Sequence, residues 1–221
     1  MNKSDNTRQS ETNTTNQIMI YILCNVISFI NRESEKHLRN IKKVTGKLLE
    51  RLMLKNECFT FSCQDIENIS LAAVLHDIGK VGIDPAILNK PGKLTDEEYE
   101  EMKKHTLLGE QILCSGELSA FREDPLIKTA MQVCRWHHER IDGNGYPDGL
   151  SGREIPLAAQ VVGIADVYDA LVSERCYKKG FSSEKAIQMI ESGECGRFDQ
   201  ILVESLKEIS GKLSSDVYMK E

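Results

Sequence analysis

The chain has 221 residues, a length that suits a single domain with some excess at its ends. Apolar residues make up 40% of it, which is enough for one sizeable hydrophobic core. The formal net charge of −6 speaks against non-specific binding of long nucleic acids, because their phosphates attract basic surfaces. A small anionic ligand is not excluded, since a metal site with a few Lys or Arg side chains is locally positive.

The cysteine and hydropathy patterns predict the compartment of the protein. The seven cysteines are odd in number and form no CxxC pair, which indicates free thiols in a reducing, cytoplasmic environment. The first 17 residues are polar and do not form a secretory signal. The longest apolar run, residues 18–30, is too short to cross a bilayer, so no transmembrane segment is expected.

Two segments precede the main body of the chain. Residues 1–17 are rich in Asn, Thr and Ser, a composition that predicts a disordered N-terminal tail. Residues 18–30 predict an N-terminal helix. After a break near residues 31–34, apolar residues recur at spacings of three and four as far as Leu54, which predicts a longer helix.

Helical patterns continue along the rest of the chain. A short apolar helix is expected at residues 66–75, with Gly79 as its C-terminal cap. Thr95 and Glu98 have the spacing of a capping box and predict a helix that runs to about Cys114. Four further helices are expected at residues 125–137, 157–173, 183–191 and 199–210.

A glycine-rich segment interrupts this helical pattern. Residues 140–156 contain four glycines and two prolines and are therefore expected to form a structured loop. No alternation of apolar and polar residues long enough for a strand is present. The sequence thus predicts one all-α domain over residues 31–221, without internal repeats.

Two aspartates lie in the most apolar of the predicted helices. Asp166 and Asp169, in QVVGIADVYDALV, are three residues apart and share a helix face. A buried carboxylate without a partner is very unfavourable, so these two need cations, hydrogen-bond donors or a metal ion. A buried salt bridge is the alternative that the segment alone leaves open.

All five histidines of the chain lie beside apolar helical segments, and none lies in the polar tail. Taken alone, a histidine such as His105 on an apolar face is more often a core residue than a ligand. With nearby carboxylates, however, the five form a nitrogen and oxygen donor set that is too large for one tetrahedral zinc and suits two or three ions. This set contains Glu33, His37, His76, Asp77, His105, His137, His138 and Asp166.

The donor types also bear on which metal is bound. Imidazole with carboxylate suits iron, manganese or zinc, and the absence of cysteine from the set argues against a structural zinc. Asp77 directly follows His76, and its two carboxylate oxygens make it a candidate to bridge two ions.

Five motifs follow one another along the chain. They are LHDIGKVGI (75–83), ILNKPGKLT (87–95), MKKHTLLGE (102–110), HHERIDGNGYPDGLSGREIP (137–156) and IADVYDALVSERCYK (164–178). In order and spacing they resemble the HD-GYP domain, the branch of the HD phosphohydrolases linked to cyclic di-GMP turnover. HDxGK alone is only moderately specific, whereas HHExxDGxGYP followed by ADxxDAL is highly specific. The resemblance covers about residues 30–205 and implies an HD-type helical domain with a glycine-rich GYP loop.

The resemblance also implies a ligand set. Its metal ligands fall on the five histidines, Asp77 and Asp166, and in members with a third metal on Glu33, one turn before His37. The alternative for Glu33 is an ordinary solvated acid, because Glu35 is close by. Two or three divalent transition-metal ions, iron or manganese, are the expected cofactors.

Residues for substrate and positioning follow from the same resemblance. Lys80 of HDIGK matches a lysine beside the metals and the scissile phosphate. Arg175 and Lys178 match cationic contacts to the substrate phosphates, with a solvated surface role as the alternative for Lys178. Asp169 is expected to orient a metal ligand or the attacking water. Gly143 and Gly145, with the neighbouring Tyr and Pro of the GYP loop, are interpreted as shaping the loop rather than as catalytic.

The implied function is metal-dependent hydrolysis of cyclic di-GMP to linear pGpG, GMP or both, through a hydroxide that bridges two metal ions. The expected partners are this cyclic dinucleotide and a regulatory protein. Two alternatives stay open. The domain would either sense a cyclic dinucleotide and signal through a partner, or act as an HD hydrolase on another nucleotide or cyclic dinucleotide. A complete ligand set argues against a pure sensor, and the GYP signature argues against another substrate.

Overall fold

The computed structural model describes residues 34–218 except for 57–58 and 175–179, and in addition five positions between residues 18 and 28. Those five, which are Ile18, Ile22, Asn25, Val26 and Ser28, are helical. The predicted tail at residues 1–17 lies outside the described residues, so it stays a prediction. The described part of the chain is an all-α fold, as the sequence predicts, and its one β-type contact is an isolated bridge between Asp142 and Ser151.

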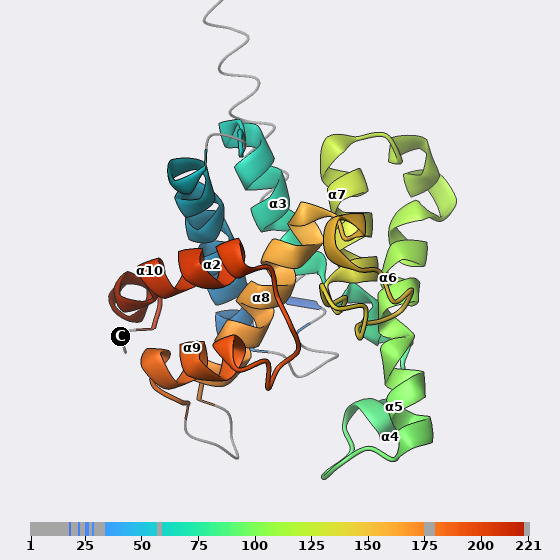
Figure 1. Ribbon diagram of the computed structural model, residues 1–221. Coiled ribbons are helices and arrows are strands. Elements are labelled where there is room, and N and C mark those ends of the chain that lie inside the picture. Colours follow the sequence, from blue (N-terminus) through green and yellow to red (C-terminus); the bar gives the residue numbers. More distant parts are fainter. Residues whose placement is uncertain are drawn as a thin grey trace, which may run out of the picture.

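The helices follow the chain as shown in Figure 1. They are α2 (Glu35–Lys55), α3 (Cys63–Leu75), α4 (Pro85–Leu88), α5 (Asp96–Lys103), α6 (His105–Cys114), α7 (Pro125–Trp136), α8 (Leu157–Val172), α9 (Ser183–Glu191) and α10 (Gln200–Asp216). Short 3-10 helices lie between them at η1 (Ile78–Gly82), η2 (Gly116–Phe121) and η3 (Gly152–Glu154).

Side-chain caps fix where several of these helices begin. The Ser34 hydroxyl accepts a hydrogen bond from His37 N at 3.2 Å and caps α2. The capping box predicted for Thr95 and Glu98 is present at the start of α5. A second capping box, formed by Ser62 and Asp65, starts α3 three residues before the predicted helix.

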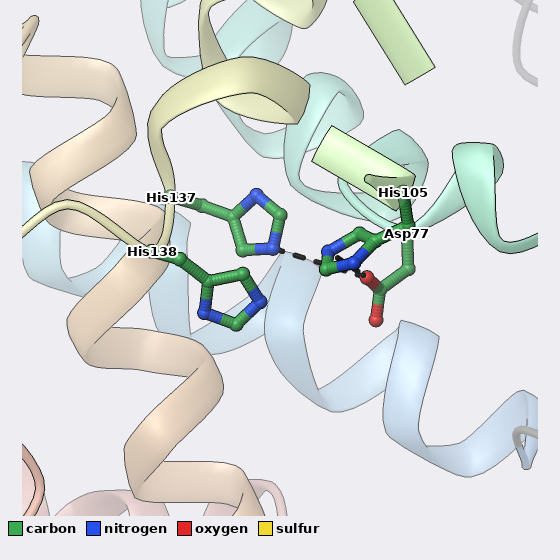
Figure 2. Close-up of side chains that lie close together, drawn as sticks. All are labelled: Asp77, His105, His137 and His138. Atoms are coloured by element: carbon green, nitrogen blue, oxygen red, sulfur yellow. Dashed lines mark ion pairs between the residues drawn. The ribbon is translucent and has the colours of Figure 1, made fainter. Parts of the chain in front are cut away.

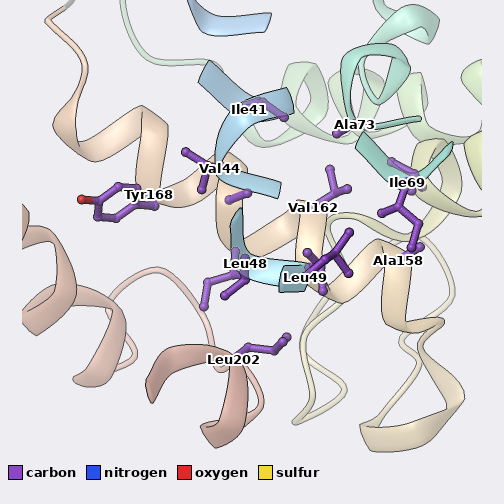
Figure 3. Close-up of a cluster of buried hydrophobic side chains, with 14 of the residues drawn as sticks. Ile41, Val44, Leu48, Leu49, Ile69, Ala73, Ala158, Val162, Tyr168 and Leu202 are labelled. Atoms are coloured by element: carbon purple, nitrogen blue, oxygen red, sulfur yellow. The ribbon is translucent and has the colours of Figure 1, made fainter. Parts of the chain in front are cut away.

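The hydrophobic core is built around α2, which contacts α3, α8 and α10 (Figures 1 and 3). Leu48, Leu49 and Leu52 of α2 are completely buried in it. Burying one such side chain fully contributes about 1.5–3 kcal/mol. Val162 of α8 and Leu202 of α10 fill the same cluster, so these three helices form a rigid frame for any side chain at their ends.

The single helix predicted from Thr95 to Cys114 is broken, and that part of the prediction is wrong. The chain turns at Lys104, and His105 becomes the first residue of α6. The imidazole Nδ1 of His105 donates a hydrogen bond to the carbonyl oxygen of Met102 at 2.7 Å. In a continuous helix this oxygen would accept from the backbone N–H of Thr106. This side-chain hydrogen bond lies at the break and provides a partner for the Met102 carbonyl there.

Gly79 is not the helix cap that its position suggests. α3 ends at Leu75, and Gly79 lies inside η1. A Cβ atom added to Gly79 would lie 1.9 Å from the carbonyl oxygen of His105, so glycine is needed here because η1 and α6 approach closely.

This close approach predicts the effect of one added methyl group. Gly79→Ala should lower the free energy of unfolding by about 2–3 kcal/mol, because the backbone of α6 cannot yield as a flexible side chain would. The matched control is Gly211→Ala in α10, where the added Cβ would meet no side chain and no other segment within 4 Å. That change should raise stability by about 0.5–1 kcal/mol. Urea unfolding measures the free energy of unfolding of both variants. Equal changes in the two variants would contradict the close approach of η1 and α6.

Candidate metal centre

Several helix ends meet α8 at one place, and each of these elements carries a histidine or an aspartate. His37 is in the first turn of α2, His76 and Asp77 follow α3, and His105 opens α6. His137 and His138 follow α7, and Asp166 lies on α8. All seven are among the predicted ligands, so the structure brings together residues separated by up to 129 positions in the sequence.

The first group of donors contains Asp77, His105, His137 and His138 (Figure 2). One donor atom from each lies within 4.8 Å of the others. Asp77 Oδ1 is 3.2 Å from His105 Nε2 and 3.8 Å from His137 Nε2. These distances leave the donor atoms facing a common point at which one ion can be held.

The second group contains His37, His76 and Asp166. Asp166 Oδ1 is 3.8 Å from His37 Nε2 and 3.9 Å from His76 Nε2. The other oxygen of Asp77, Oδ2, is 3.0 Å from His76 Nε2. Asp77 thus lies between the two groups with one oxygen directed at each, the arrangement expected of a carboxylate that bridges two ions.

Hydrogen bonds from the far side of the rings select the tautomer of three histidines. Nδ1 lies 2.8 Å from a carbonyl oxygen in His76, 2.7 Å in His105 and 2.9 Å in His137. Because a carbonyl only accepts, each Nδ1 must carry a proton and donate it. In the neutral ring this leaves a lone pair on Nε2, which is the atom that points at the donor groups.

Buried polar atoms without hydrogen bonds test whether a metal fits. Asp77 Oδ1, His105 Nε2 and His137 Nε2 are buried and have no hydrogen-bond partner in the structure. Leaving several such atoms unsatisfied at one point is unfavourable by about 1–3 kcal/mol each. A divalent cation would satisfy all three at once, so the residues present fit a metal ion.

The charge states of the first donor group also suit a metal. Burial, with the positive charge of neighbouring rings, holds the pKa of His137 and His138 well below the usual value, and burial lowers the pKa of His105. These imidazoles are therefore neutral at pH 7, the form that binds metal. Burial would raise the pKa of Asp77, but the charges of His76 and Lys80 outweigh it and hold the pKa well below its usual range.

Asp169 and Lys80 each make a hydrogen bond to one member of this donor set. Asp169 Oδ2 accepts a hydrogen bond from His37 Nδ1 at 2.6 Å, so this carboxylate orients the imidazole rather than joining either donor group. The Lys80 ammonium donates to Asp77 Oδ2 at 2.6 Å and is partly exposed, with 22% of its side chain accessible. Three other predicted residues, Glu33, Arg175 and Lys178, lie outside the described residues.

Two charged residues of the HHER segment were not predicted to matter. Glu139 is 4% exposed, and its carboxylate accepts backbone N–H groups from Asp148, Gly149 and Leu150 at 2.7–3.1 Å. The guanidinium of Arg140 donates to the carbonyls of His137 and Glu139. The sequence did contain a signal for these two residues. They are ionic residues between an apolar helix and a glycine-rich loop, and the backbone N–H groups of such a loop need acceptors.

The glycine-rich loop covers one side of the first donor group. Its Tyr146 ring stacks on His138 with a centroid distance of 4.6 Å. Gly143 has a φ of +76°, and a Cβ added to Gly145 would lie 2.4 Å from the backbone of Glu139 and Arg140. The structural role predicted for these glycines agrees with this geometry, since they let the loop fold back against the donor group.

These features define an all-α domain with a buried histidine and aspartate cluster, and the comparison with known families agrees. The HD domain family model matches residues 17–202, and the chain belongs to this family. The family and the cluster together make the site a divalent-metal site.

Two curated relatives show which proteins the chain resembles within this family. A cyclic di-GMP phosphodiesterase of Vibrio cholerae is 37% identical over 92% of this chain and 42% of its own length. A 3'3'-cGAMP-specific phosphodiesterase 2 of the same species is 32% identical over 88% of this chain and 35% of its own length. The chain thus spans less than half of the length of these curated relatives.

A solved structure supports the fold. The HDG"Y"P protein from Bdellovibrio bacteriovorus superposes with a TM-score of 0.57 at 22% identity, over 80% of this chain and 53% of that one. The resemblance to HD-GYP proteins indicated by the sequence motifs is confirmed. Within the described residues, none of the helices combines the length and the hydropathy that a bilayer crossing requires.

The buried carboxylate of Glu139 gives a prediction about the loop. Glu139→Gln should lower the free energy of unfolding by about 1.5–3 kcal/mol, because the amide group of Gln replaces one accepting oxygen with a donor that faces backbone N–H groups. The matched control is Glu154→Gln, which changes an exposed carboxylate of the same segment that caps Ser151. That variant should lose less than about 1 kcal/mol. Denaturant unfolding of the metal-free proteins measures both, and a Glu139→Gln variant no less stable than the control would refute the loop-pinning role.

Proposed function

We propose that this domain is a metal-dependent phosphodiesterase that hydrolyses cyclic di-GMP to pGpG, GMP or both. The observation that carries the proposal is the position of Asp77 between two donor groups, because a carboxylate shared by two ions is a common feature of two-metal hydrolytic sites. The name of the Vibrio cholerae relative supports the substrate.

The proposed ligands are those of the two donor groups, with Asp77 bridging them and Glu33 as a ligand to a third ion. We propose iron or manganese as the metals, because the donor atoms are imidazole nitrogens and carboxylate oxygens without a thiolate. The domain boundaries at residues 1–17, 18–30 and 31–221, the regulatory protein partner and the cytoplasmic location stay predictions from the sequence.

Each side chain near the site has a proposed task. When bound, the metal ions supply Lewis-acid activation of water and of the phosphoryl group. Lys80 supplies a positive charge beside Asp77 that stabilises the phosphoryl oxygens as their charge grows in the transition state. Arg175 and Lys178 are proposed to bind the other phosphate of the substrate. Asp169 keeps the lone pair of His37 directed at the donor group.

One relative points to 3'3'-cGAMP as a second candidate substrate. The relative named as a 3'3'-cGAMP-specific phosphodiesterase has 32% identity to this chain, which is close to the 37% of the relative named for cyclic di-GMP. Hydrolysis of 3'3'-cGAMP is therefore the alternative function. Both substrates have two phosphodiester bonds in one ring, so the same metal chemistry serves either.

The bridging position predicts the metal content. Protein purified without oxygen from metal-replete medium should contain about two or more transition-metal ions per chain. Asp77→Ala should remove most of the metal and the activity, because this carboxylate faces both donor groups. Asp84→Ala, which changes an exposed aspartate that caps α4, should leave the metal content unchanged. Elemental analysis measures both, and wild-type protein with one ion or fewer would overturn the two-metal proposal.

Substrate turnover is a separate prediction. Metal-loaded protein incubated with cyclic di-GMP should form pGpG or GMP, separated by chromatography, while the Asp77→Ala variant should form neither. The same assay with 3'3'-cGAMP decides between the two substrates. Binding of a cyclic dinucleotide without any product would favour a sensing module, and turnover restricted to other nucleotides would favour a different HD hydrolase.

A further inference from the structure

The Asp169 carboxylate has an unusually complete set of hydrogen-bond donors. Its Oδ2 accepts from His37 Nδ1, and its Oδ1 accepts from Asn40 Nδ2 at 2.8 Å and from Ser173 Oγ at 3.0 Å. The hydroxyl of Tyr218 donates to the same Oδ1 at 2.8 Å. The side chain is 1% exposed, so water does not compete for these positions. Three donors converge on Oδ1 and one reaches Oδ2, and together they hold the buried carboxylate in one orientation.

Tyr218 reaches this carboxylate from a separate part of the chain. Asn40 is on α2, which also carries His37, and Ser173 directly follows α8, which carries Asp169. Tyr218 comes instead from the segment after α10, where Val217 ends the helix and packs into the core. The Tyr218 ring also packs against Tyr168 with a centroid distance of 6.1 Å.

The negative charge of Asp169 strengthens its hydrogen bond with the Tyr218 hydroxyl. A phenol that donates to an ionised carboxylate makes a charge-assisted hydrogen bond, which is stronger than one between neutral groups. It fixes Oδ1, and through the rigid carboxylate it fixes Oδ2 against the His37 ring. A loose carboxylate would let the ring rotate and move Nε2 away from Asp166 and His76.

We propose that Tyr218 is a positioning residue of the metal centre, which holds Asp169 so that His37 presents Nε2 to the second donor group. The inference rests on the proposed function in one respect, namely that His37, His76 and Asp166 bind a metal ion. It makes the segment after α10 a functional part of the site, although it is 181 positions from His37 in the sequence. The competing role is structural, with the hydroxyl serving only to anchor the end of the chain.

The test is Tyr218→Phe in the full chain, which keeps the ring and its packing and removes one hydroxyl. Chelator-treated protein is titrated with Zn²⁺ alone in competition with a chromophoric chelator, and no substrate is present. The binding step of the second donor group is identified as the one lost in Asp166→Ala. We expect Tyr218→Phe to weaken that step by roughly three- to tenfold, less than the ten- to hundredfold typical when a direct partner of a ligand is removed. The other step should not change.

Tyr168→Phe is the matched control. It removes a tyrosine hydroxyl from the neighbouring ring, and the bond lost is to Ser183 Oγ at 3.0 Å rather than to Asp169. Thermal unfolding of both metal-free variants shows how much stability each hydroxyl contributes. Tyr168→Phe should leave both zinc-binding steps unchanged, whatever its effect on the melting temperature.

The outcomes separate the inference from the proposed function. Wild-type protein that shows no zinc step sensitive to Asp166→Ala would refute the metal role of the second donor group itself. With that step present, equal zinc affinity in Tyr218→Phe and wild type would refute the positioning role. So would an equal loss of affinity in Tyr168→Phe, because it would trace the effect to general destabilisation. A loss confined to Tyr218→Phe and to the second donor group supports the inference.

Discussion

The central constraint on this structure is that Asp77 and four neighbouring histidines, most of them buried, are held together at one place. Such a cluster opposes folding unless its buried atoms find partners, and three of them have none among the protein groups described. The helices are arranged accordingly. α2, α8 and α10 form the apolar frame, and α2 and α8 also carry His37 and Asp166. The ends of α3, α6 and α7 bring the other donors to the same place. A metal ion that binds this arrangement also stabilises it, since the unfolded chain has no such site.

The sequence was sufficient for much of this arrangement because its signals are local or compositional. The apolar run around Asp166 predicted a buried helix, and α8 covers Leu157–Val172. The position of every histidine beside an apolar segment predicted a shared site. In the structure His37 and His76 lie in one donor group, because α2 and α3 pack together. The Thr95 and Glu98 spacing predicted a helix start that the structure contains.

What the sequence could not supply are contacts between distant segments. Glu139 is identified as the acceptor for three loop N–H groups only when the loop is folded back on it. Gly79 has the spacing of a helix cap, but glycine is required there because the backbone of α6 lies too close for a Cβ atom. The partners of Asp169 come from three separate segments, so a pattern within one helix predicted that it needs partners without naming Tyr218.

The ring of His105 has a consequence for what can replace it. Its Nδ1 donates to the Met102 carbonyl while its Nε2 faces Asp77, so one side chain serves both the backbone and the donor group. A carboxylate at this position could supply a metal ligand but no donor for that carbonyl, and an aliphatic side chain supplies neither. A substitution here therefore removes an internal hydrogen bond together with a ligand.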